Sequence, residues 1–383
     1  LRSKYSNTLT KEFQKKEREL IRKYHKLVKA KKEKSCYDHI FYDDLKIMLK
    51  ESKYISLDHV PIDAMNNFPI FYITGLQGET DYEFTDKQSY LDYLHRFKGI
   101  PDDTKTILEN MKKGIKFKDT LPRIIVLDLR DQYNNMLDMN LEEIDVPKNI
   151  KKEVIKSIET YVIPSIKQLK DFLENEYLCK CTDKLGLSSL SGGLTIYKGL
   201  LEEQTMKGYT PKDIHNLGLR EVKRIINKIN ALKRKMKFKG SIKEFYKHCT
   251  DNFKGEKQII DYSKNLQNEI YKKIYPKYFN KELKQTDLAD IKRVKDKKSR
   301  MYAFYIGTKK RGTFYVNTNI YKQINKNELM TLTLHESIPG HHLQLFTHNR
   351  DKDLPLYIQG SNNTAYCEGW ALYCENFIDL HSD

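Results

Sequence analysis

Long apolar runs and targeting signals are both missing from this 383-residue sequence. No stretch approaches the roughly 18 apolar residues that a membrane-spanning helix needs, so we expect no transmembrane segment. No signal-peptide pattern opens the chain, which begins with Leu1 and not with methionine. The cellular location therefore stays open. It is the cytoplasm, or the cell envelope or exterior if an N-terminal signal has been removed.

Cysteine is scarce, with six residues and no C-x-x-C spacing. The nearest two, Cys179 and Cys181, are separated by one residue, which is too close for an unstrained disulfide between them. A protein held together by disulfides would carry more cysteines in a much shorter chain. Reduced thiols are the default interpretation.

Acidic residues are outnumbered, since 69 Lys and Arg face 52 Asp and Glu and give a formal charge of +17. Basic runs at 29–34, 233–239 and 292–300 have the charge needed to contact nucleic acid or an anionic surface. They carry no recognised nucleic-acid-binding motif and lack the interleaved aromatic residues of a base-stacking platform. We therefore interpret them as solvated helix faces and expect no nucleic-acid partner.

The hydrophobic pattern favours helices over most of the chain. Helical patterns follow Thr10, Thr85 or Asp86, and Thr210, each a plausible helix cap. Strand-like alternation is clear only at 302–306 and 312–317, and the short apolar segment 123–129 fits either a strand or a helix. The sequence predicts a mainly α-helical fold with a small β-sheet near the C-terminal third.

Three segments are expected on this pattern. Residues 1–60 form an N-terminal helical segment, 61–300 a helical body, and 301–383 a metal-binding core made of a strand, a motif helix and a glutamate-bearing helix. A chain of this length is long enough for two or three domains.

The motif helix carries the sequence HESIPGHH at residues 335–342, with Glu368 and Glu375 following on a second predicted helix. His335, His341 and His342 offer imidazoles, and Glu336 offers a carboxylate beside the first of them. Neutral imidazoles with a carboxylate bind Zn²⁺, and a further carboxylate can accept a proton from a zinc-bound water. The sequence therefore predicts a site for one zinc ion per chain.

The histidine spacing differs from that of H-E-x-x-H, in which two histidines lie one helical turn apart. A step of six, from His335 to His341, turns to another helix face, and a step of seven, to His342, advances about 10 Å along the axis. Pro339 breaks helical hydrogen bonding and Gly340 tolerates unusual dihedral angles. We expect a break there to bring His341 beside His335, with His342 as the alternative ligand or as a group supporting the ligands.

The two downstream glutamates are seven residues apart, so both can lie on one helix face. Glu368 is the predicted third ligand. Glu375 is either an acceptor that orients a ligand imidazole or a solvated charge.

The motif and its flanks resemble domain-of-unknown-function family 885 (DUF885), a mainly bacterial family. The most specific match is HESIPGHHLQ, with GTFYVNT upstream and AYCEGWALYCE downstream, and the earlier segments YLDYLHRFKGIPDDTKTILENMKKGI, TLPR and YTPKDIHNLGLREVKRI also fit. The likeness runs from about residue 60 to the end. It implies a relative of zinc peptidases with a gluzincin-like architecture, in which His335, His341 or His342, and Glu368 bind zinc and Glu336 acts as base. Family members usually continue well past EGWALY, so we expect the C-terminal part of that fold to be missing here.

The predicted function is a zinc metallopeptidase in which Glu336 is the general base on a metal-bound water that attacks a peptide bond. His342, Tyr305 and Tyr366 are candidates for stabilising the oxyanion. The strand at 312–317 is either a pairing edge for an extended peptide substrate or an internal strand of the sheet. The alternatives are a metal-dependent amidase or esterase acting on a small acyl substrate, and a non-catalytic, truncated binding protein. The oligomeric state is not readable from the sequence.

Overall fold

The computed structural model describes residues 7–51, 54–62, 86–144, 146–205, 208–279, 283–294, 301–307, 312–359 and 363–377. The chain divides into two compact units, Leu1–Glu203 and Gln204–Asp383. Neither expected boundary, at 60/61 or at 300/301, coincides with this division, and the three-segment scheme stays a prediction.

Apart from an isolated bridge between Pro122 and Thr182, the regular elements described in the first unit are all helices. Its helices are α1 (Lys11–Ala30), α2 (Cys36–Glu51), α3 (Ile55–Asp58), α5 (Lys87–Phe97), α6 (Ile100–Phe117), α7 (Arg123–Leu137), α8 (Lys151–Ser157), α9 (Ile163–Phe172) and α10 (Gly193–Thr205). Two π-helical turns, Ile158–Val162 and Leu173–Tyr177, extend α8 and α9. The ambiguous segment 123–129 is thus helical, as the start of α7.

Local sequence accounts for where these helices begin and end. Thr10 caps α1 by accepting a hydrogen bond from the Phe13 amide, as expected from the sequence. Pro101 stands in the first turn of α6, where a missing N–H costs nothing. The same helix ends at Phe117, and its C-cap Lys118 adopts the left-handed conformation with φ of 61°.

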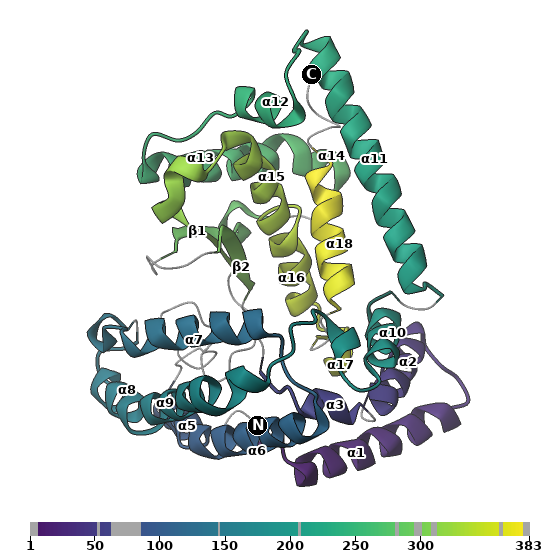
Figure 1. The fold of residues 1–383 in the computed structure, drawn as a ribbon. Helices are drawn as coiled ribbons and strands as arrows, with labels where there is room; N and C mark the ends of the chain where they lie inside the picture. The colour runs from purple at the N-terminus through teal and green to yellow at the C-terminus, as the bar shows by residue number, and fades with distance from the viewer. Residues whose placement is uncertain are drawn as a thin grey trace. The chain divides into compact units, whose positions relative to one another are not determined.

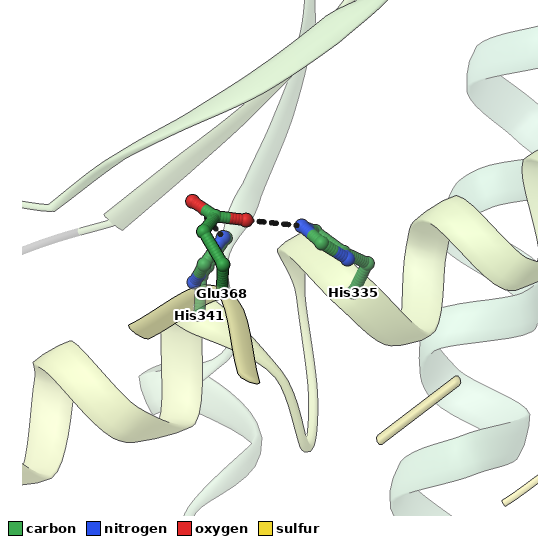
Figure 2. A group of neighbouring side chains, drawn as sticks. All are labelled: His335, His341 and Glu368. Atoms are coloured by element: carbon green, nitrogen blue, oxygen red, sulfur yellow. Dashed lines mark ion pairs between the residues drawn. The ribbon is translucent and has the colours of Figure 1, made fainter. Parts of the chain in front are cut away.

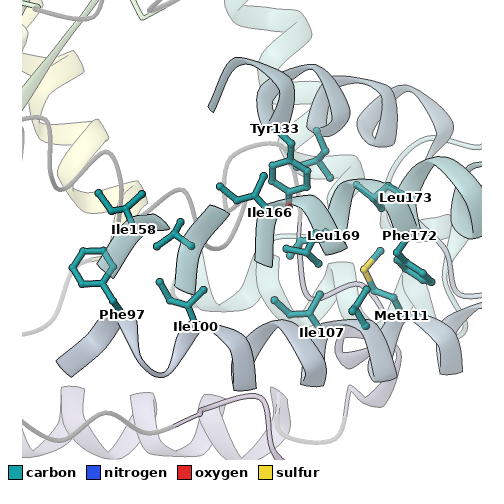
Figure 3. Close-up of a cluster of buried hydrophobic side chains, with 14 of the residues drawn as sticks. Phe97, Ile100, Ile107, Met111, Tyr133, Ile158, Ile166, Leu169, Phe172 and Leu173 are labelled. Atoms are coloured by element: carbon teal, nitrogen blue, oxygen red, sulfur yellow. The ribbon is translucent and has the colours of Figure 1, made fainter. Parts of the chain in front are cut away.

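The core of the first unit lies between α6, α7 and α9 (Figure 3). Ile107 and Met111 lie one turn apart on α6, and Ile166 and Leu169 face them from α9; all four are fully buried. Burying each such side chain stabilises the fold by about 1.5–3 kcal/mol. The periodic apolar face of each helix is therefore what assembles this unit.

The second unit combines helices with one small sheet (Figure 1). Its elements are α11 (Pro211–Lys235), α12 (Ile242–His248), α13 (Glu256–Glu269), α14 (Tyr275–Tyr278), β1 (Asp290–Arg293), β2 (Ala303–Gly307), β3 (Gly312–Val316), α15 (Lys326–Glu336), α16 (His341–Arg350), α17 (Leu356–Gln359) and α18 (Thr364–Glu375). The expected fold class, mainly α-helical with a small sheet beside the motif helix, is confirmed.

The sheet has the order β1-β3-β2. β3 pairs in parallel with β1 and antiparallel with β2, with Phe314 opposite Ile291 on one side and Tyr305 on the other. Both edges of β3 are therefore occupied, and the idea that this strand pairs with a peptide substrate is wrong. Among the described strands, the outer positions belong to β1 and β2.

α13 and α15 pack against the sheet, where Ile259 and Leu329 join Phe314 and Val316 in one apolar cluster. A second apolar cluster, around Leu334, Ile338 and Leu343, joins α15 to α16. α18 then packs against both of these helices, so three helices from separate stretches of sequence meet at one place. This meeting point carries the HESIPGHH motif.

Helix α11 is long, yet none of its 25 residues is buried. Thr210 and Asp213 form a reciprocal capping box at its start, and Lys233, Arg234 and Lys235 occupy its last turn. Within the described part of the chain, no helix is both long and apolar enough to span a bilayer.

Candidate metal centre

The helical path breaks inside the motif, as the sequence predicts. α15 ends at Glu336 and α16 begins at His341, with non-helical dihedral angles at Ser337 and Gly340 and a cis peptide bond before Pro339. A side chain at Gly340 would overlap the carbonyl oxygen of His335, so glycine is required for the chain to turn back this closely.

The turn brings His335 and His341 together with Glu368 of α18 (Figure 2). One ligand atom from each of the three residues lies within 4.8 Å of the other two. The Nε2 atoms of His335 and His341 are 3.4 Å and 3.6 Å from the two carboxylate oxygens of Glu368. Their ring centroids are 4.7 Å apart and their planes are perpendicular, so both imidazoles point at one spot.

The three side chains differ in exposure. His335 and His341 are 18% and 12% exposed, whereas Glu368 is 57% exposed. The two histidines are thus partly buried, and Glu368 reaches them from α18 on the exposed side of the cluster.

Glu375 lies on the same face of α18 as Glu368 and contacts the other nitrogen of the His335 ring. Its Oε1 is 2.8 Å from Nδ1 of His335. A carboxylate accepts, so Nδ1–H donates and the lone pair of Nε2 is directed towards His341 and Glu368. Metal-binding histidines are usually oriented by a carboxylate in this way.

Glu336 is buried beside the three residues, with only 7% of its surface exposed. Burial raises the pKa of its carboxyl to about 7, the nearby His335 opposes this, and the charges of Glu368 and Glu375 add to the rise. A carboxyl poised between its two protonation states near neutral pH is suited to taking and releasing a proton.

Burial, followed by the charge of His335, lowers the pKa of His341. This shift favours the neutral imidazole, which is the form that binds metal.

His342 turns away from this group into the protein. Its Nε2 donates to the backbone carbonyl of Asp287 at 2.7 Å, and its Nδ1 lies 2.9 Å from the hydroxyl of Tyr305, which donates to it. Both ring nitrogens are engaged, and burial lowers the pKa of the imidazole. Of the two alternatives for the second ligand, the structure brings only His341 to His335 and Glu368.

The Tyr305–His342 contact depends on a glycine in the sheet. A side chain at Gly312, the first residue of β3, would overlap both the Tyr305 hydroxyl and Nδ1 of His342. The register places Gly312 opposite Gly307 at the end of β2. The β2–β3 pair therefore ends in two glycines, and the absence of a side chain at Gly312 leaves room for the His342 ring.

The other sequence predictions have mixed outcomes. Of the three oxyanion candidates, Tyr366 is 67% exposed on α18, and Tyr305 and His342 bond to each other. Sequence reasoning missed two contacts: the Asp287 carbonyl on His342, and the Trp370 indole N–H, which donates to the Pro339 carbonyl at 2.9 Å. Backbone acceptors carry no sequence signal, so neither contact was predictable.

Comparison with known proteins identifies the family. Residues 2–380 match the family described as "Bacterial protein of unknown function (DUF885)", and no curated protein sequence matches this chain. Two solved structures, both described as putative lipoproteins, share the fold. The protein from Colwellia psychrerythraea has a TM-score of 0.80 at 19% identity. The match covers 98% of this chain and 70% of the Colwellia chain.

The second structure, a protein of unknown function from Shewanella oneidensis, has a TM-score of 0.63 at 12% identity, with 99% of this chain and 72% of the other covered. At these identities the two likenesses establish the fold alone. The family match covers nearly the whole sequence, and the chain therefore belongs to DUF885.

Proposed function

We propose that this chain is a zinc-dependent peptidase. The observation that carries the proposal is the convergence of His335, His341 and Glu368 from three separate helices on one point, with ligand atoms within 4.8 Å of one another. The order of these residues, two histidines on a broken helix pair and a glutamate on a following helix, supports a gluzincin-like arrangement.

The donor set fits zinc by its chemistry. Two neutral imidazoles and one carboxylate are the ligands of many catalytic zinc sites, which keep a further position open for water or substrate. Harder ions such as Mg²⁺ and Ca²⁺ prefer oxygen ligands throughout. A zinc ion held here would supply Lewis acidity and lower the pKa of a water molecule.

The roles of the protein side chains follow from their positions. Glu336 accepts a proton from the attacking water and passes it to the leaving nitrogen, and burial keeps its carboxyl basic enough to do so. Glu375 holds His335 in the tautomer that leaves Nε2 available. The open side next to Glu368 admits the substrate.

The outer edge of β2, with which no described strand pairs, supports an extended peptide as the substrate. The Asn317 amide donates to the Tyr302 carbonyl, so the alternating pattern of an antiparallel pair turns the backbone groups of Ala303 and Gly307 away from β3. α16, which begins with His341, packs against β2. A peptide added to this edge would lie beside the helix that presents His341.

The test combines metal content with hydrolysis. Purified wild type, His335→Ala and Glu336→Gln are compared for zinc by elemental analysis and for cleavage of a panel of peptides and small esters. We expect about one zinc per chain in the wild type and in Glu336→Gln, a large loss in His335→Ala, and a fall of about 10²–10⁴ in hydrolysis for Glu336→Gln.

Each contrary result has a distinct meaning. Absence of zinc from the wild type after loading would refute the metal site. Full activity of Glu336→Gln would refute its role as base. Hydrolysis of esters or small amides without cleavage of any peptide would reassign the enzyme to an amidase or esterase class.

A further inference from the structure

The first unit contains a second candidate site, a cavity of about 670 Å³ that is separate from the metal centre. This volume lies within the range of about 300–1,000 Å³ typical of small-molecule sites. Apolar side chains form much of its wall, including Leu9, Phe117 and Ile196, and a few polar groups converge on it. All of its lining residues belong to the first unit.

The most informative of these groups is a buried histidine. The His59 side chain is 9% exposed, and its Nδ1 lies 2.9 Å from Oδ2 of Asp119, which accepts its hydrogen bond. The other carboxylate oxygen of Asp119 accepts from the Ser191 amide at 2.7 Å. Both carboxylate oxygens of Asp119 are thus engaged, and Asp119 fixes the His59 ring, which also stacks on Phe117 with centroids 5.2 Å apart.

The second ring nitrogen of His59 makes no hydrogen bond to any described residue, although the ring lines the cavity. An imidazole nitrogen that is held at the wall of a cavity without a protein partner is available to a ligand. Tyr54 also lines the cavity, and its hydroxyl is buried without a hydrogen-bond partner among the described residues.

The charges around the cavity favour an anion. Lys11 and Lys113 line it, and neither forms an ion pair with a described residue; Lys113 donates only to the Asn110 side chain, at 3.1 Å. Of the two acids in the lining, Asp119 is bonded to His59, and Asp58 accepts from the Gln14 amide. The first turn of α10, with Thr195, forms another wall and adds the positive end of a helix dipole.

We propose that this cavity binds a small organic carboxylate. The carboxylate would accept hydrogen bonds from the Lys113 ammonium, and it would lie beside the His59 ring, whose orientation Asp119 fixes. The apolar body would lie against Leu9, Phe117 and Ile196. No such site is implied by the metal centre, and the proposal is independent of the function proposed above.

The experiment uses three probes of equal shape and different charge: phenylacetate, phenylacetamide and phenethylamine. Each is titrated into the full chain labelled with ¹⁵N-histidine, and the imidazole resonances are followed by NMR; the His59 signals are assigned by their loss in His59→Gln. We expect saturable shifts of the His59 signals with phenylacetate at a Kd of about 1 mM or below. Binding of the amide should be at least about tenfold weaker, since a hydrogen bond to a charged group is lost.

Variants separate the site from general charge effects. Lys113→Met should weaken phenylacetate binding about tenfold, whereas Lys105→Met, which removes the same charge from an exposed position on α6 outside the cavity, should change it less than about twofold. Lys113 is a half-buried residue of α6, and methionine keeps much of its aliphatic length. Its replacement therefore tests the proposal even if His59→Gln fails to fold.

Three outcomes would overturn the proposal. They are equal affinities for phenylacetate and phenylacetamide, undiminished binding in Lys113→Met, and no saturable shift of the His59 signals up to about 20 mM probe. Preferential binding of phenethylamine would show instead that Asp58 dominates the charge of the cavity.

Discussion

His335 and Glu375 are forty residues apart in the sequence, yet Nδ1 of His335 lies 2.8 Å from Oε1 of Glu375. The contact ties the end of α15 to the end of α18, so the helix that supplies one histidine also depends on the helix that supplies Glu368. The orientation of the imidazole is thus set by the packing of two helices and not by its own rotamer preference alone.

Replacing Glu375 with glutamine should lower zinc affinity by about 10–100-fold without abolishing binding, because the amide is a weaker acceptor for Nδ1–H. Competition with a chelating indicator at fixed pH measures this change. Glu221→Gln, on the exposed helix α11, serves as the matched control. Unchanged affinity in Glu375→Gln would show that the contact does not support metal binding.

Proline at two adjacent positions of β2 tests the substrate edge. Ala303→Pro removes an N–H that points away from β3, so long peptides should be cleaved less efficiently while short esters and the melting temperature change little. Phe304→Pro removes a bond within the sheet and should destabilise the unit. Equal losses for long and short substrates in Ala303→Pro would contradict pairing along β2.

Gly312→Ala should destabilise the second unit by about 1–3 kcal/mol, because the new methyl group overlaps the Tyr305 hydroxyl and the His342 ring. Removing the hydroxyl with Tyr305→Phe in the same chain should recover part of that loss, which denaturant unfolding of the two single variants and the double variant would measure. Strict additivity would mean that the two positions do not interact.

The first unit should lose stability between pH 5 and pH 8 through Glu51. Burial, with the neighbouring Glu203 carboxyl, raises the pKa of Glu51 to about 7 from 4.5. The folded state therefore holds a proton that the unfolded state releases, and the stabilisation present below pH 4.5 is lost as the pH rises through 7.

Glu51→Gln removes this titration, so its unfolding free energy should vary less with pH than that of the wild type. Glu17→Gln, at an exposed position of α1, should leave the wild-type dependence intact. Parallel pH curves for the wild type and Glu51→Gln would exclude the assignment.

Much of the site's local geometry could be predicted because it depends on short-range signals. Asn325 and Asn363 cap the two helices that carry His335 and Glu368, and Pro339 with Gly340 ends one helix and allows the next to begin. These effects act within a few residues, and sequence patterns record them. That His335, His341 and Glu368 bind metal, and that Glu336 acts as base, stays a prediction.

The remaining features depend on contacts between distant segments. β1 has the sequence DIKR, which shows no alternation of its own and becomes a strand only by pairing in parallel with β3. The position of β3 between two strands could not be read from 312–317 for the same reason. The choice between the two adjacent histidines was likewise decided by the Asp287 carbonyl and Tyr305, which engage His342 from elsewhere in the chain.

Helix α11 persists without any buried residue. Its hydrogen bonds are protected only by its capping box, its length and the favourable charges at its ends, since no core closes over them. Amide hydrogens along α11 should therefore exchange with solvent through local fraying and not through global unfolding. Rapid exchange in this segment would coexist with slow exchange in α15, and the two helices of one unit would report on different equilibria.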